Sequence, residues 1–389
     1  MTERNRPAYD EGRPTEAART TVGAAIKGRG ATFNPANRFR REQREAVDDG
    51  WTPTSVGAET HDSDDDPPPL KTIVRIQPAR TIISYNTSPD IPFDRSINPY
   101  QGCEHGCIYC YARPTHAYLD LSPGLDFETK LFAKPNAAEL LRRELAKPGY
   151  RPEPIALGTN TDPYQPIERE WRITRSVIET LAECDHPLTI TTKGVLIERD
   201  LDLLAPMAKK RLVRVFISVA ILDRELARKL DPRAPAPHRR LQSIKALSDA
   251  GVPVGVNVAP VIPQLTDREL ETILEEAAKA GATCANWIML RLPLEVAPLF
   301  RDWLAVHYPL RAAHIMSIVQ QIHGGKDYQS GFGVRMGGQG ELADVIDRRF
   351  AIACKRFNLS SVRDPPLDTS RFRPPAVAPT GPKQLDLFG

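Results

Sequence analysis

Three cysteines share one short stretch, CEHGCIYC at 103–110, with the spacing Cys-x3-Cys-x2-Cys. Thiolates this close together can hold one iron–sulfur cube, because Cys103, Cys107 and Cys110 would each bind a different iron. The fourth iron then has no protein ligand from this loop and is open to a chelating molecule. The amino and carboxylate groups of S-adenosylmethionine form such a chelate. An electron passed from the cube into the sulfonium would break a carbon–sulfur bond and release a 5′-deoxyadenosyl radical.

Two other metal sites stay open on the residues alone. Zinc usually takes four ligands from paired Cys-x2-Cys motifs, and the chain has no second pair, although His105 or His116 could complete a set. A ferredoxin-type cluster would need a fourth cysteine nearby, and the next one, Cys184, lies about 70 residues further on. Cys184, Cys284 and Cys354 lie in or beside helical patterns and are predicted to be small core residues.

The elements that must position the cysteine motif follow a regular pattern. Residues 71–86 alternate apolar and polar side chains, which predicts one or two strands. After them, short β-branched runs alternate with longer helical patterns. Strands are predicted just before Cys103 and at 154–160, 187–193, 212–220, 252–260 and 286–292. Helices are predicted at 136–146, 174–184, 199–210, 238–251 and 267–281.

Strand and helix repeated about six times predict an α/β fold with a parallel sheet and right-handed crossovers. The count favours a partial (β/α)6 barrel, because a full eight-unit barrel would need more chain than residues 90–310 supply. In such folds the chemistry lies at the carboxyl ends of the strands. We therefore expect the binding residues in the loops that follow each strand.

The two ends of the 389-residue chain have a different composition, with many of its 36 prolines. Six basic residues lie between Lys27 and Arg44, and eight acidic residues with no basic one lie between Glu45 and Asp66. Such a segment is predicted to be disordered, with 28–39 as a candidate docking strip. The predicted regions are a basic-then-acidic disordered leader (1–70), the barrel (71–325), a glycine-rich and helical extension (326–361) and a disordered proline-rich tail (362–389).

Composition gives broad limits on location and partners. The first residues are polar and charged, unlike a secretory signal, and no run approaches the roughly 18 apolar residues of a membrane-spanning helix. We expect a cytoplasmic protein without a membrane partner. The net charge of +3 neither demands nor excludes a nucleic acid.

The motif, with Tyr109 just before its third cysteine, resembles the signature of the radical SAM superfamily. The wider segment INPYQGCEHGCIYCYAR (97–113) is similar to the spore photoproduct lyase-like branch, whose members are related to DNA repair photolyases. Further segments match that branch in order along the barrel, at 158–170, 192–204, 227–247 and 258–274. The resemblance implies one [4Fe–4S] cluster on the three cysteines, S-adenosylmethionine as cofactor near Tyr109, and an electron donor such as flavodoxin or ferredoxin.

The loop after the second predicted strand carries Gly158, Thr159 and Asn160. Glycine lets the backbone approach a ligand, and the next two side chains offer neutral hydrogen bonds. By resemblance this loop receives the methionyl amino group. Thr192 and Lys193 end the next strand, where the family often contacts the ribose or the carboxylate of the cofactor.

Polar residues elsewhere in the barrel are further candidates. Ser218 and Asn257 interrupt apolar strands, so both are expected to point into the barrel, where a cofactor can satisfy them. Arg240 begins a helix and could pair with the cofactor carboxylate or lie in solvent. Asp162 and Glu168 could face a substrate or be ordinary surface carboxylates.

The resemblance also implies an action on DNA, in a repair-like reaction. Spore photoproduct lyase uses a further cysteine as hydrogen-atom donor, and residues 111–183 of this chain contain none. A tyrosine or 5′-deoxyadenosine itself would have to supply the hydrogen. Modification of RNA or protein, or a non-catalytic iron–sulfur adaptor, are the alternatives.

The chain ends in QLDLF (384–388), which resembles the pentapeptide that binds the bacterial sliding clamp. Gln384, Leu385, Leu387 and Phe388 would make the contacts. Apolar residues at the end of a polar, proline-rich tail call for a partner, and we expect the clamp to be that partner. The alternative is that the peptide folds back onto the barrel.

Overall fold

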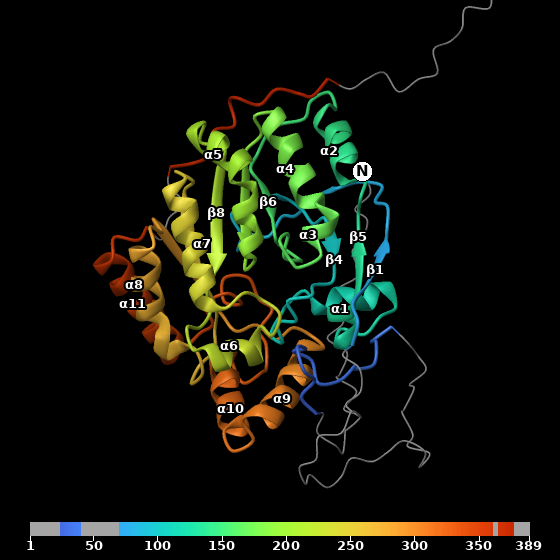
Figure 1. Cartoon of the computed structure of the whole chain (residues 1–389). Coiled ribbons are helices and arrows are strands. Elements are labelled where there is room, and N and C mark those ends of the chain that lie inside the picture. Colours follow the sequence, from blue (N-terminus) through green and yellow to red (C-terminus); the bar gives the residue numbers. More distant parts are fainter. Residues whose placement is uncertain (1–23, 40–69, 361–364, 377–389) are drawn as a thin grey trace, which may run out of the picture.

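The computed structural model describes residues 24–39, 70–360 and 365–376. Its centre is a seven-stranded sheet with the strand order β10-β9-β8-β7-β6-β3-β2 (Figure 1). Six of these strands run parallel, and β2 (Ile83–Tyr85) pairs antiparallel with β3. The parallel strands are β3 (Arg95–Ile97), β6 (Ile155–Leu157), β7 (Leu188–Thr192), β8 (Val213–Ser218), β9 (Val254–Val261) and β10 (Cys284–Met289). The α/β class and the partial barrel of six units are confirmed.

The predicted crossover helices are all present, with ends that differ by a few residues. They are α2 (Ala137–Leu145), α4 (Ile173–Glu183), α5 (Leu201–Lys209), α7 (Pro237–Asp249) and α8 (Leu270–Lys279). Each buries one apolar face; in α8, for example, Leu270, Ile273, Leu274 and Ala277 face the core at helical spacing. The chain continues into α9 (Val296–His307), α10 (Ala312–Ile322) and α11 (Glu341–Arg356). Within the described ranges, no helix is long and apolar enough to cross a membrane.

A second, three-stranded sheet lies beside the cysteine motif, with the order β1-β5-β4. Strand β1 (Ile73–Ile76) was expected, whereas β5 (Lys130–Ala133) was not. The pattern missed β5 because it is only four residues long and follows the one-turn helix α1 (Leu125–Thr129) directly. Strand β4 (Tyr100–Gln101) pairs with β5 and leads into Cys103.

Both predicted disordered ends contain a segment that packs on the barrel. At the N-terminal end, Ala31 is fully buried and Arg29 is 7% exposed, so residues 24–39 do not fit the predicted disorder of 1–70. At the C-terminal end, residues 365–376 cross the end of the barrel at which the strands begin (Figure 1). Arg373 N donates to Cys184 O at 2.9 Å, and Arg214 Nη2 donates to Pro365 O at 2.7 Å. The predicted disorder of 362–389 does not fit this segment.

The C-terminal segment rests on a buried histidine, His186. The ring of Phe372 meets His186 edge-on at 5.2 Å between centroids. The two ring nitrogens of His186 lie 2.9 Å from the hydroxyl of Tyr150 and 2.9 Å from the carbonyl of Pro187. Burial lowers the pKa of His186 to about 4, and the Pro187 carbonyl offsets only part of that shift.

The low pKa of His186 predicts a loss of stability in mild acid. The His186 ring takes up a proton near pH 6.5 in the unfolded chain, but only near pH 4 in the folded chain. The stability that depends on the neutral ring is therefore complete above pH 6.5 and is lost as the pH falls towards 4. We expect His186 to lower the free energy of unfolding by about 2 kcal/mol between pH 7.5 and pH 5. Urea unfolding of the cluster-free protein at both pH values should show this difference, and His186→Gln should reduce it by that amount. An unchanged difference in the variant would contradict the assignment.

Candidate cofactor site

The cluster loop, residues 103–110, joins strand β4 to the 3₁₀ helix η1 (Arg113–Leu119). The side chains of Cys103 and Cys107 are each only 7% exposed, and Cys110 is partly buried. All three are free thiols. The loop therefore gathers three unpaired thiols under a largely closed surface.

Neighbouring segments fix the path of the cluster loop. Cys103 N donates to Phe127 O at 3.0 Å, and Ile108 N donates to Leu230 O at 3.1 Å. These bonds come from opposite sides, from α1 and from the end of α6 (Arg224–Leu230). A loop that is neither helix nor strand thus has a defined backbone course.

A buried ion pair supports the loop from behind. Arg113 and Glu128 are both fully buried, and Arg113 Nη2 lies 2.5 Å from Glu128 Oε1. The same guanidinium donates to the carbonyls of Gly106 at 3.1 Å and Cys107 at 2.9 Å. Arg113 therefore positions the cluster loop through its backbone. The sequence motif contains this arginine, but its partner Glu128 lies on another element, so the pair was not foreseen.

The three thiols fit a cluster better than a single ion. Across the described part of the chain, no three His, Cys, Asp or Glu side chains converge closely enough to hold one metal ion. His116 directs Nε2 at Lys130 O, 2.9 Å away, and His105 directs Nδ1 at Asp162. Neither histidine completes a zinc set with the three thiols, whereas a cluster needs only one thiolate for each of three irons.

The thiols of Cys107 and Cys110 have raised pKa values. Burial raises the pKa of Cys107 well above its usual range, and the charges of Asp231, Cys110 and Cys103 add to that shift, whereas Lys193 opposes it. Burial also raises the pKa of Cys110. A group of iron ions would release these protons, because metal binding requires the thiolate form.

Asp162, in the loop after β6, joins the cluster loop to the end of β7. Its Oδ2 accepts from Lys193 N at 2.7 Å and lies 3.4 Å from His105 Nδ1, and its Oδ1 accepts from Thr192 Oγ1 at 2.5 Å. Burial would raise the pKa of Asp162, but His105 and these hydrogen bonds outweigh it and lower the pKa to about 2. Asp162 fits neither alternative, a substrate-facing or an ordinary surface carboxylate, because both of its oxygens are bound by protein groups.

Glu168 is also buried rather than exposed. It is 0% exposed and accepts from Tyr100 Oη at 2.5 Å, Thr174 N at 2.9 Å and Arg199 Nη2 at 2.8 Å. The expectation of a substrate-facing or surface carboxylate is wrong here as well. Glu168 anchors the loop after β6 to strand β4.

In the loop at 158–160, the backbone of Gly158 closely approaches the backbone of Thr191, as the glycine suggested. Gly158 has φ +86°, and a Cβ there would lie 2.0 Å from Thr191 O, so no other residue fits. Asn98, at the end of β3, donates through Nδ2 to Thr159 Oγ1 at 3.1 Å and accepts from Asn160 N at 2.9 Å. Sequence reasoning missed Asn98. Its position after a strand in INPYQG was the available signal.

Tyr109, Ser218, Lys193 and Arg240 meet around Asp231. Tyr109 Oη donates to Asp231, and Arg240 Nη2 donates to Asp231 at 3.0 Å. Arg240 Nη1 donates to the backbone carbonyl of Ser218 at 3.2 Å, and Lys193 Nζ lies 5.6 Å from the ring centroid of Tyr109. Arg240 is 1% exposed, so it is neither in solvent nor free to reach a ligand. It holds Asp231, which in turn holds Tyr109.

Asn257 carries an unsatisfied polar atom into the barrel. It lies on β9 in register with Ser218 on β8. Its Oδ1 is buried and has no hydrogen-bond partner among the described residues. A buried amide oxygen without a partner is costly, so this position suits a ligand that brings a donor, such as an amine or a hydroxyl.

A cation and two aromatic rings stand beyond the end of β10. The guanidinium of Arg291 lies 5.0 Å from the ring centroid of Tyr111 and 5.9 Å from that of Tyr328. Its Nε is buried without a partner, and within the described ranges no carboxylate forms an ion pair with it. Tyr111 directly follows Cys110 in the sequence and its side chain is exposed. We call Tyr111, Arg291 and Tyr328 the mouth cluster; no sequence pattern pointed to Arg291.

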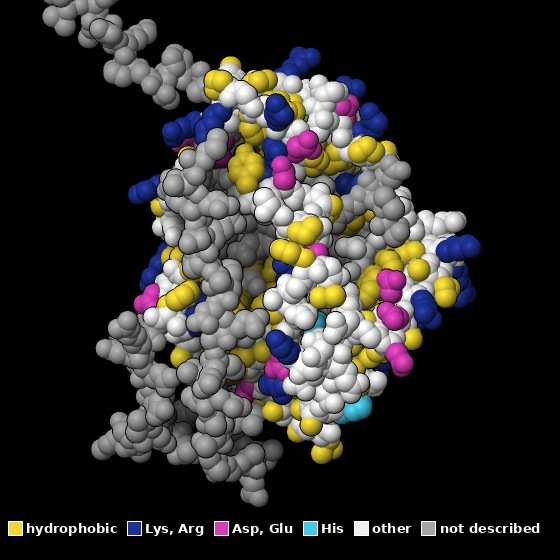
Figure 2. Space-filling model, turned by 180° about the vertical axis from the view of Figure 1, so that it is seen from behind, with side chains coloured by type: hydrophobic (Ala, Val, Ile, Leu, Met, Phe, Trp, Pro, Cys, Tyr) yellow, Lys and Arg dark blue, Asp and Glu magenta, His cyan; other side chains and the backbone are white. Residues whose placement is uncertain are grey.

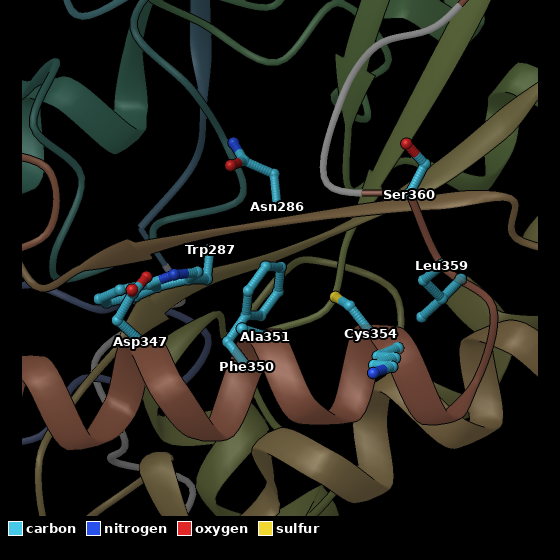
Figure 3. Close-up of a pocket in the computed structure, with 9 residues that line it drawn as sticks. Asn286, Trp287, Asp347, Phe350, Ala351, Cys354, Leu359 and Ser360 are labelled. Atoms are coloured by element: carbon cyan, nitrogen blue, oxygen red, sulfur yellow. The ribbon is translucent and has the colours of Figure 1, made fainter.

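A cavity of about 630 Å³ lies elsewhere, between the edge strand β10 and α11. Figure 3 shows Trp287 on the strand and Phe350 and Cys354 on the helix directed into the space between the two elements. None of its lining residues belongs to the cluster loop or the mouth cluster. This cavity therefore lies apart from the three thiols.

Comparison with known proteins gives consistent matches. Residues 97–277 match the family model described as "Radical SAM superfamily". "Uncharacterized protein Rv2578c" of Mycobacterium tuberculosis is 45% identical over 221 residues, which cover 56% of this chain and 65% of the relative. "Uncharacterized protein MJ0683" of Methanocaldococcus jannaschii is 27% identical over 214 residues, which cover 55% of this chain and 76% of the relative. The chain thus spans 65% of the length of its mycobacterial relative.

Solved structures show the same fold. A spore photoproduct lyase complexed with dinucleoside spore photoproduct aligns with a TM-score of 0.52 at 18% identity, covering 73% of this chain and 79% of that one. A variant of the enzyme with bound AdoMet and the same dinucleoside aligns equally, with a TM-score of 0.52 at 18% identity and the same coverage. At this identity the likeness establishes the fold.

Proposed function

We propose that the protein is a radical SAM enzyme that acts on DNA in a repair-type reaction, because residues 97–277 match the radical SAM family model. Cys103, Cys107 and Cys110 would hold one [4Fe–4S] cluster. The cluster and S-adenosylmethionine, when bound, supply a carbon-centred radical. The observation that carries the proposal is the set of three unpaired thiols on one supported loop, two of them buried and one partly buried, with Lys193 and Asp231 beside them.

Residues around the thiols would receive the cofactor. Asn257 Oδ1 can accept a hydrogen bond from it, and the loop at 158–160 offers the side chains of Thr159 and Asn160 beside a glycine that admits close approach. Lys193 is a cation near Cys107, because Cys107 and Asp231 raise the pKa of Lys193 against the opposing effect of burial. Thr192, Ser218, Tyr109 and Arg240 would act by positioning, through Asp162 and Asp231.

The mouth cluster supports a nucleic acid as substrate. A guanidinium without a carboxylate partner is suited to a phosphate, and tyrosine faces are suited to stacking on bases. On the described part of the face in Figure 2, basic and acidic side chains are interspersed. The mouth cluster is the DNA contact in this proposal because of Arg291 and the two tyrosine rings beside it. That the solved spore photoproduct lyase holds a dinucleoside lesion agrees with this choice.

Two partners complete the proposal. A flavodoxin or ferredoxin would deliver the electron that the cluster passes on. The sliding clamp would bind Gln384, Leu385, Leu387 and Phe388, which lie outside the described residues. The clamp encircles DNA, so this contact would keep the enzyme close to its substrate.

Product analysis with an Arg291 variant tests the proposal. The anaerobically reconstituted, reduced protein should convert S-adenosylmethionine to 5′-deoxyadenosine and methionine, and ultraviolet-damaged DNA should increase the yield. Arg291→Met should lower the DNA-dependent increase by at least about tenfold, because a charged contact to phosphate is lost. Arg301→Met, an arginine on α9 that pairs with Asp327 at 2.5 Å, is the matched control.

Each other outcome has a defined meaning. Intact S-adenosylmethionine in the presence of a loaded, reduced cluster would identify an iron–sulfur adaptor and refute the enzyme. An increase with RNA or protein but not with DNA would refute DNA as substrate while keeping the radical chemistry. An equal effect of both arginine variants would remove the mouth cluster from substrate binding.

A further inference from the structure

An N-terminal segment lies directly against the back of the cluster loop. We call residues 29–38 the strap. A Cβ at Gly30 would lie 1.9 Å from Gly106 O and 3.3 Å from Ile108 N, so the strap and the cluster loop touch backbone to backbone. Ala31 is fully buried in the same contact and packs in one apolar cluster with Cys107 and Ile108. Strap and loop are about 75 positions apart in the sequence.

Glu128 joins the strap to the loop. One carboxylate accepts three hydrogen bonds from different segments: Gly30 N at 3.0 Å, Ala31 N at 2.8 Å and Arg113 Nη2 at 2.5 Å. Arg113 in turn holds the carbonyls of Gly106 and Cys107. A continuous chain of buried hydrogen bonds thus runs from the strap to a thiol-bearing residue.

Further contacts fix both ends of the strap. At its start, Arg29 donates to Glu128 O at 3.1 Å and to Thr72 Oγ1 at 3.3 Å, and Thr72 Oγ1 donates to Glu104 in the cluster loop at 2.5 Å. At its end, Arg38 forms an ion pair with Glu295 at 2.8 Å. Asn37 Nδ2 donates to Ala117 O in η1 at 3.0 Å. The strap therefore spans the whole back of the loop.

We propose that the strap and Glu128 are positioning elements for the cluster, which hold the cluster loop so that its three thiols are presented together. Loops change shape more readily than helices or strands, and a site on a loop depends on its support for its geometry. Here Glu128 lies within the matched domain, whereas the strap lies outside it, because the match begins at residue 97. The cluster part of this inference rests on the proposed function; the holding of the thiols does not.

The sharpest test is Gly30→Ala in the full-length chain. The backbone at Gly30 has no positive φ, so alanine fits its conformation, and the added methyl collides only with the cluster loop. Gly331→Ala is the matched control, because its nearest neighbour would be Val334 Cγ2 at an ordinary 3.5 Å. Glu128→Gln is the second variant; it keeps the shape of the side chain and removes the charge that the two strap amides and Arg113 share.

Alkylation of the cluster-free protein, read by mass spectrometry at each cysteine, measures how well the thiols are held. We expect Cys103 and Cys107 to react at least about tenfold faster in Gly30→Ala and Glu128→Gln than in wild type, because local opening exposes them. Cys184 should keep its wild-type rate, which shows that the barrel is intact. After anaerobic reconstitution, both variants should lose iron to a chelator at least about tenfold faster than wild type and Gly331→Ala.

The outcomes separate this inference from the proposed function. If wild type takes up no cluster, the proposed function fails, and the alkylation rates still decide whether the strap holds the thiols. If Gly30→Ala and Glu128→Gln match wild type in both alkylation and iron loss, the strap is not a positioning element. If Cys184 reacts faster along with Cys103 and Cys107, the strap stabilises the fold as a whole and the specific role is refuted.

Discussion

A chain in which Cys107 is replaced by alanine is expected to hold no iron–sulfur cluster and to leave S-adenosylmethionine intact. Three ligands from one loop are the fewest that can secure a cube whose fourth iron is left open, so the loss of one leaves two irons without protein ligands. The side chain of Cys107 is only 7% exposed, and water has little access with which to replace it. The iron and sulfide contents should fall from about four atoms of each per chain in the wild type to background in the variant.

The other three cysteines provide matched controls for Cys107→Ala. Cys184, Cys284 and Cys354 are buried, and none of them lies in the cluster loop. Cys184→Ala, Cys284→Ala and Cys354→Ala should keep the wild-type iron content and the wild-type rate of cofactor cleavage. Loss of the cluster in one of these variants, or full iron in Cys107→Ala, would show that the ligands are assigned wrongly.

A chain without residues 384–389 is expected to lose its binding to the sliding clamp and to keep its cluster. The apolar side chains of Leu385, Leu387 and Phe388 would supply most of the area buried against the clamp. A peptide this short binds weakly, because few contacts must offset the ordering of the chain, so the loss of these three anchors should abolish detectable binding. Titration of immobilised clamp with each of the two proteins should show that the truncation lowers the affinity by at least roughly tenfold.

Substitutions within the peptide give that experiment its control. Replacing Leu387 and Phe388 together with alanine should weaken clamp binding nearly as much as the truncation. Asp386→Ala changes the intervening polar position and should bind like wild type. Equal binding by the truncated and full-length chains would refute the clamp contact, and the case for a DNA substrate would then depend on the mouth cluster and the fold.

The elements of the barrel could be predicted because each carries its pattern locally. The apolar run of β9 and the spacing of Leu270, Ile273 and Leu274 in α8 depend only on neighbours a few positions away. Strand β5 was missed because it is short and directly follows α1, and because its partners, β1 and β4, are far from it in the sequence. The strap lies within the predicted docking strip 28–39, but its partners could not be predicted, because Glu128 and Thr72 lie more than 40 residues away from Arg29.

The sequence predicts the three neighbouring thiols, but not the side chains that support their loop. The three cysteines can be identified by their spacing alone, and Gly158 by its position after a strand. Whether a carboxylate meets substrate or protein depends on side chains from other loops, as His105 and Arg199 show for Asp162 and Glu168. The charge and type of a residue can be read from the sequence, whereas the fold decides which side chain it pairs with.

The segment 365–376 leaves the molecule at the end of the barrel where the strands begin, opposite the end that bears the thiols (Figure 1). From Ala376 to Gln384 the chain has eight Cα–Cα steps, a reach of at most about 30 Å. An enzyme that is bound through its last residues would therefore have the end that bears the thiols facing away from the point of attachment. If the clamp binds the peptide, DNA inside the clamp would meet the end that bears the thiols only beside the ring, and the short tether would limit where along the duplex the enzyme can act.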